Sequence, residues 1–181
     1  MTGGKNVDYK AIVKQAFLDS NIHFTEAELE SIDYADFGLD QIETEGLNLI
    51  VYVNNDTYCA KEMVLLPGQT CPEHRHPRRG ADGEIAGKRE TFRCRKGKVY
   101  LYVEGEPNVA QIESKLPHGH EAYYTVMHEI ELGPGEQYTI EPDTLHWFQA
   151  GEAGAVISEF STPSDDPSDI FTNPNIKRVT E

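Results

Sequence analysis

The apolar residues near the start of the chain follow the spacing of one helix face: Tyr9, Ile12, Val13, Ala16 and Phe17. The polar residues 19–21 end this predicted helix. Thr25 and Glu28 then form a capping box, which predicts a second, short helix that continues to about Tyr34. We therefore expect residues 1–45 to form a helical N-terminal arm.

After Gly46 the pattern changes to short, β-branched or alternating runs, and Gly or Pro separates nearly all of them. The predicted strands are 47–53, 59–66, 70–76, 89–95, 99–104, 123–132, 136–141, 145–149 and 155–160. Residues 77–88 and 104–121 interrupt this rhythm, as an irregular loop and a hairpin extension. Many short strands at regular spacing indicate a mainly β fold, an antiparallel sandwich or barrel over residues 46–162. The polar residues 163–181 are expected to pack on it as a tail.

Composition and charge limit the possible partners. The chain has 181 residues, of which 31 are acidic and 16 are Lys or Arg, and its net charge is −15. Such a charge repels phosphate backbones and anionic lipids, so no nucleic-acid or membrane partner is expected. The sequence contains neither a long apolar span nor the pattern of a signal peptide. Three cysteines without a CxxC motif are typical of free thiols in a reducing cytoplasm, where we expect the protein.

The strongest chemical motif is His74-Arg75-His76 in a predicted strand. Alternate residues of a strand point to the same face, so both imidazoles can reach one point. Glu90 lies in the next predicted strand, and a third histidine, His146, is the second residue of a later one. Three imidazoles and one carboxylate suit Mn, Fe, Co, Ni or Zn, with positions left open for water or substrate.

The spacing of these residues resembles the two motifs of the cupin superfamily. They read Gly68-x5-His74-x-His76 with Glu90-x6-Gly97, then Pro142-x3-His146. The resemblance implies a single cupin-type, jelly-roll-like β-barrel that holds one metal ion through three histidines and one glutamate. The sequence departs from the pattern in one place, because thirteen residues separate His76 from Glu90 where three or four are typical. Glu84 is nearer and is the alternative ligand, although it falls in a Gly-rich loop.

Longer strings are similar to one cupin family, the D-lyxose ketol-isomerases. They are residues 71–77, 87–97, 146–149, 158–161 and 169–174, and the similarity spans about residues 60–181. The resemblance implies an intramolecular oxidoreductase that isomerises a free aldose such as D-lyxose or D-mannose to its ketose. It also implies a divalent metal ion, commonly manganese.

Aldose–ketose isomerisation moves a hydrogen between C1 and C2, and a base can carry the proton through an enediol. Glu159 is the expected base because it follows His146 closely on a predicted barrel strand, and Lys88 would hold or protonate the O1 or O2 oxygen. Trp147 and Phe148 offer apolar surface to the C–H face of a sugar. Asp169 would pair with a distal hydroxyl or orient a partner. A hydride shift is the alternative mechanism.

Two other functions agree with the same motifs. Three histidines and one glutamate also bind iron in cupin dioxygenases, which consume O₂ and need no base at Glu159. A non-catalytic sugar-binding cupin is the third reading, and it is favoured if Lys88 and Glu159 face solvent. We expect a homodimer, because pairing can bury both the sheet edges and the amphipathic N-terminal arm.

Overall fold

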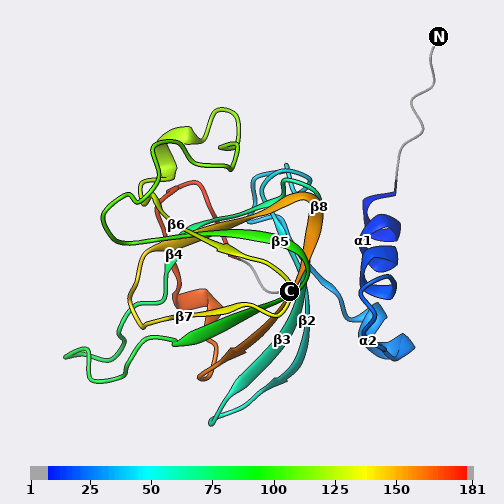
Figure 1. Cartoon of the computed structure of the whole chain (residues 1–181). Coiled ribbons are helices and arrows are strands. Elements are labelled where there is room, and N and C mark those ends of the chain that lie inside the picture. The colour runs from blue at the N-terminus through cyan, green and yellow to red at the C-terminus, as the bar shows by residue number, and fades with distance from the viewer. Residues whose placement is uncertain (1–7, 179–181) are drawn as a thin grey trace.

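Two helices precede the sheet in this computed structural model, which describes residues 8–178 (Figure 1). Helix α1 (Tyr9–Leu18) starts where the Asp8 side chain accepts backbone N–H groups, and α2 (Glu26–Glu30) starts at the Thr25–Glu28 capping box. The expected continuation of α2 to Tyr34 is wrong. Residues Asp33–Ala35 instead form strand β1, because they pair with the start of β2.

The rest of the molecule is one curled antiparallel sheet. Its strands are β2 (Leu47–Asn54), β3 (Cys59–Leu65), β4 (Thr70–Arg75), β5 (Glu90–Val103), β6 (His128–Leu132), β7 (Gln137–Ile140), β8 (His146–Ser161) and β9 (Ile170–Phe171). Strand β8 is central. One of its edges pairs with β4 and then with β3, and the other pairs with β5. The far edge of β5 pairs with β7 and β6, and the sheet curls into a half-barrel, which agrees with the expected mainly β, cupin-type fold.

The two longest strands are β5 and β8, and each covers two segments that the sequence predicts as separate strands. Strand β5 continues through Gly97, where the register shifts twice and φ is +75°. A side chain at Gly97 would place its Cβ 2.0 Å from the carbonyl oxygen of Gly154 in β8. The glycines therefore allow the paired strands to bend together without ending. By contrast, β6 begins only at His128, later than the predicted 123.

Two hydrophobic clusters hold the layers together. The larger cluster fills the barrel and includes Met63, Phe92, Leu101 and Phe148. The second lies between the helices and the outer face of β2 and β3, where α1 buries Val13 and Phe17. Figure 1 shows both helices beside these strands. Buried polar side chains accompany the larger cluster, among them His74 on β4, Glu90 at the start of β5 and His146 at the start of β8.

The last described residues pass beside β4 and Phe37. Strand β9 pairs with the edge of β4, and a 3₁₀ turn (Asp166–Ser168) precedes it. The backbone N–H of Lys177 then donates to the Phe37 carbonyl at 2.9 Å. Within residues 8–178, no helix is long and apolar enough to cross a membrane.

Candidate functional site

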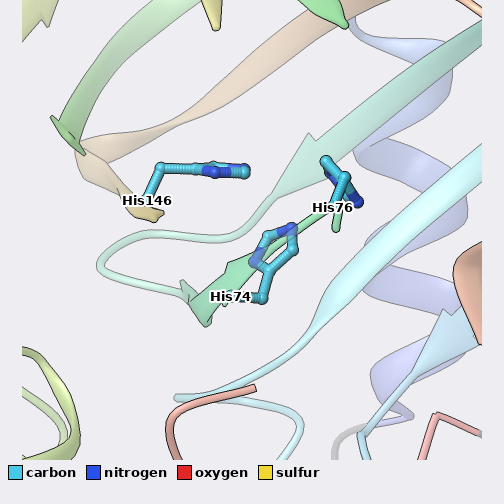
Figure 2. Close-up of side chains that lie close together, drawn as sticks. All are labelled: His74, His76 and His146. Carbon is cyan, nitrogen blue, oxygen red and sulfur yellow. The ribbon is translucent and has the colours of Figure 1, made fainter. Parts of the chain in front are cut away.

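Three buried histidines converge where β4 pairs with β8. His74 lies in β4, His76 follows that strand, and His146 begins β8 as the register partner of His74. Figure 2 shows the three rings turned toward a common space. One ligating atom from each ring lies within 4.8 Å of the others, which is close enough for a single metal ion. Strand alternation and the β4–β8 pairing thus build the cluster.

The outer nitrogen of each ring has its own partner. The Nδ1 atoms of His74 and His146 lie 2.8 and 2.9 Å from the carbonyl oxygens two residues before them. The Nδ1 of His76 lies 2.5 Å from Oδ1 of Asp169. A carbonyl can only accept, so Nδ1 of His74 and His146 must carry the proton and their Nε2 atoms keep a lone pair. The Nε2 of His146 is buried and has no hydrogen bond.

Charge in the cluster is set mainly by burial and by Glu90. Burial, together with the neighbouring imidazoles, holds the pKa of His74 well below its usual range, so this ring is neutral. Burial also opposes charge on His76, but Glu90 and Asp169 raise its pKa to about 9. A metal ion at His76 would therefore displace a proton.

Glu90 is the carboxylate of this cluster. Its Oε1 lies 3.0 Å from Nε2 of His146 and 3.3 Å from Nε2 of His76, and its side chain is 1% exposed. The thirteen residues that separate it from His76 form an excursion that returns at Gly87. A Cβ at Gly87 would lie 2.0 Å from the His76 carbonyl oxygen, so the two ends of the loop touch. Glu84 is exposed on that loop and accepts from a neighbouring backbone N–H, away from the histidines.

Lys88 and Glu159 face each other in a cavity that His74, His76 and Glu90 also line. The Nζ of Lys88 lies 2.7 Å from Oε1 of Glu159 and 2.5 Å from Oε2 of Glu90. Both Lys88 and Glu159 are buried, and the Ser161 hydroxyl donates to the Glu159 carboxylate. Burial alone would lower the pKa of Lys88, but the two carboxylates raise it well above its usual value. The cavity therefore holds an ammonium between two carboxylates.

The structure separates the two aromatic residues that were expected to contact the sugar. Phe148 lines the cavity with His74 and His76. Trp147, the next residue back on β8, points to the opposite face, is fully buried and stacks on Tyr102 with ring centroids 3.9 Å apart. Its Nε1 donates to the Val126 carbonyl oxygen. Trp147 therefore does not reach the cavity, because adjacent residues of a strand alternate. Asp169 does line the cavity, where it contacts His76.

Three further charged residues line the cavity and were missed by the sequence analysis: Lys61, Asp166 and Arg178. The Nζ of Lys61 lies 3.3 Å from Asp166, and an Arg178 nitrogen lies 3.2 Å from the same carboxylate. A lysine within the otherwise mostly apolar strand β3 was the available signal. Its register partner on β8 is Glu159, a pairing that only the tertiary structure reveals.

Solved structures with a similar fold include sugar isomerases. L-ribose isomerase from Acinetobacter sp. DL28, in complex with L-ribose, matches with a TM-score of 0.74 and 17% identity, over 93% of this chain and 92% of that chain. The ligand-free L-ribose isomerase of Cellulomonas parahominis also gives 0.74 at 17% identity, over 94% and 92%. At this identity the likeness shows the fold alone, a cupin-like β-barrel.

Sequence comparison is more specific. The model of the D-lyxose isomerase family matches residues 21–181. A D-lyxose/D-mannose isomerase of Thermosediminibacter oceani is 64% identical over 93% of this chain and 91% of its own length. A D-lyxose ketol-isomerase of Cohnella laeviribosi is 56% identical over 92% and 90%. The protein is thus an aldose–ketose isomerase. The chain belongs to the D-lyxose isomerase family.

Proposed function

We propose that this enzyme interconverts D-lyxose and D-xylulose, and also D-mannose and D-fructose, with one divalent metal ion. The names of the two relatives support these substrates. One structural observation carries the proposal. Three imidazoles cluster beside Glu90, whose carboxylate also contacts Lys88 of the buried Lys88–Glu159 pair, so a metal site, an acid and a base are within reach of the same sugar.

The proposed metal ligands are His74, His76, Glu90 and His146. Their chemistry fits a first-row divalent ion, and we propose manganese, with Zn, Co, Fe or Ni as alternatives. The fit rests on the Nε2 lone pairs that face the cavity and on the unpartnered Nε2 of His146. When bound, such an ion polarises the carbonyl of the sugar and makes the neighbouring C–H more acidic.

The proton is moved by side chains of the chain itself. The Glu159 carboxylate accepts the proton from C2 of the aldose, while the Lys88 ammonium donates a proton to O1, which gives the enediol. Lys88 then takes the proton of the O2 hydroxyl, and Glu159 returns its proton to C1, which gives the ketose and restores both groups. The 2.7 Å contact between these two groups supports the pairing. A hydride shift would leave Glu159 without this role.

Phe148 and Asp169 complete the proposed site. Phe148 supplies apolar surface to the C–H face of the sugar. Of the two roles expected for Asp169, its contact with His76 Nδ1 favours the orientation of a partner. A non-catalytic sugar-binding cupin is disfavoured, because Lys88 and Glu159 are 8% and 3% exposed and face the cavity.

We also propose a cytoplasmic homodimer. Helix α1 leaves Ile12 and Leu18 exposed, and β2 leaves Val51 and Tyr52 exposed, so apolar surface remains on both sides of the helix–sheet contact. Pairing with a second copy would cover it. Light scattering of the purified protein measures this, and a monomer mass would reject the dimer.

The decisive experiment combines elemental analysis with a ketose assay over unphosphorylated pentoses and hexoses. We expect one divalent ion per chain and the highest turnover with D-lyxose or D-mannose. The absence of ketose from both sugars in the metal-loaded protein would reject the proposed substrates. Sugar-dependent O₂ uptake without ketose would instead favour the dioxygenase.

A further inference from the structure

Glu73 is a buried carboxylate that belongs neither to the metal ligands nor to the acid–base pair. It precedes His74 on β4, is 1% exposed, and does not line the cavity. Its Oε2 accepts the backbone N–H groups of Thr125 and Val126 at 2.5 and 3.0 Å. Its Oε1 accepts the hydroxyls of Thr125 and Thr172 at 2.9 and 2.6 Å. One side chain thus joins β4 to two segments that are distant in the sequence.

The first is the tail segment, residues 169–173, which Glu73 holds through Thr172. Besides the hydroxyl contact, the Thr172 N–H donates to the Glu73 carbonyl oxygen at 3.0 Å. The tail segment carries Asp169, which contacts Nδ1 of His76, and Phe171, whose ring stacks on His74 with centroids 5.3 Å apart. Strand β9 has only two residues, so its own backbone pairing holds the segment weakly.

The second is the loop segment, residues 124–127, which Glu73 holds through two backbone N–H groups. In this segment the Val126 carbonyl oxygen accepts the indole N–H of Trp147 at 2.9 Å. Trp147 is the residue that follows His146 on β8. The orientation of the loop segment is therefore transmitted to the start of β8, where the third histidine lies.

We propose that Glu73 is a positioning residue of the metal centre. It fixes the tail segment that orients His76 and the loop segment that anchors the strand of His146. This inference rests on the proposed function, because it takes these histidines to be metal ligands. Partners that orient metal ligands from outside typically contribute about 10–100-fold to metal affinity.

The test compares Mn²⁺ affinity, measured by competition with a fluorescent chelator, among variants of the full chain. Thr172→Val removes one hydroxyl and keeps the side-chain shape, whereas Thr172→Ser keeps the hydroxyl. We expect Thr172→Val and Glu73→Gln to weaken Mn²⁺ binding by about 10–100-fold, and Thr172→Ser to bind like the wild type. In the metal-free protein, Thr172→Val should also speed hydrogen exchange in the tail segment.

The matched control is Glu62→Gln. Glu62 is also a buried carboxylate, 3% exposed, and accepts the Ser158 hydroxyl, but it contacts neither the tail segment nor the loop segment. We expect this variant to melt earlier without a change in Mn²⁺ affinity. An equal loss of affinity in Glu62→Gln and Thr172→Val would show a general stability effect and overturn the inference.

The two proposals fail in different ways. If His74→Ala binds Mn²⁺ like the wild type, the proposed metal site is wrong and the role of Glu73 is rejected with it. If His74→Ala loses the metal but Thr172→Val keeps wild-type affinity and hydrogen exchange, only the positioning role is overturned. The Thr172 pair decides this outcome even if Glu73→Gln does not fold.

Discussion

The Nζ of Lys88 lies 2.7 Å from Oε1 of Glu159, although the two residues are 71 positions apart in the sequence. They meet because β5 pairs with β8, where Phe92 is the register partner of Glu159. A proton donor just before β5 and a proton acceptor on β8 therefore face one cavity. This pair leads to the first prediction.

Glu159→Gln should abolish most of the turnover while metal and sugar still bind. The amide keeps the shape of the side chain but cannot accept the transferring proton, so the variant should have a lower kcat. General base catalysis contributes about 10²–10⁴-fold, and a decrease of that order is expected in steady-state assays. Glu90→Gln is the control and should weaken metal binding instead. A nearly unchanged kcat in Glu159→Gln would favour a hydride shift.

Removal of the metal should lower the melting temperature. An ion that binds only the folded chain adds about 2.7 kcal/mol when its free concentration is about 100 times Kd. Three buried histidines converge on the site, so the folded chain binds the ion far better than the unfolded one. Calorimetry with and without a chelator measures the difference. Equal midpoints after confirmed metal loss would contradict a site integrated in the barrel.

Trp147→Phe should affect stability rather than sugar binding. The substitution removes the indole N–H and leaves the Val126 carbonyl oxygen without its donor, which costs about 1–3 kcal/mol of unfolding free energy. With saturating metal, the KM for D-lyxose should stay near the wild-type value. Phe148→Ala, which changes the cavity wall, should raise it. A similar rise in KM for Trp147→Phe would contradict this prediction and indicate that Trp147 contributes to sugar binding.

The sequence predicts the parts of the site that depend on local spacing. Strand alternation brings His74 and His76 to one point, and the same rule, applied to His146, would have separated Trp147 from Phe148. The spacing of residues along the chain does not predict contacts between segments that are far apart in the sequence. The Lys61–Asp166 contact and the Glu73 junction join segments about 50–100 residues apart. The sequence pattern divides β5 and β8 into two strands each. These predictions are wrong because bulges at glycines bend β5 and β8 without ending them.

Acid should remove the contribution of Asp166 to stability. Burial alone would raise the pKa of this carboxyl, but Lys61, the Ser164 hydroxyl and Arg178 hold it well below its usual range. A lowered folded-state pKa means that the stabilisation is complete above the unfolded pKa of about 4 and is lost as pH falls below it. The free energy of unfolding of the wild type should therefore exceed that of Asp166→Asn by about 1.5–3 kcal/mol at pH 7. Urea titrations at pH 7 and pH 3 should show this gap narrowing, and a constant gap would reject the assignment.

Gly87→Ala should damage the metal site through the backbone. A Cβ at Gly87 would lie 2.0 Å from the His76 carbonyl oxygen and 2.9 Å from the Pro77 carbonyl oxygen, and neither is the movable end of a side chain. The chain must then shift where the loop returns, between a proposed ligand and Lys88. We expect weaker Mn²⁺ binding and lower kcat together, with a lower melting temperature. Gly119→Ala is the control, because its Cβ would meet nothing within 4 Å, although its φ of +84° adds backbone strain. If Gly87→Ala retains wild-type metal affinity, the close return of the loop is not what places Glu90.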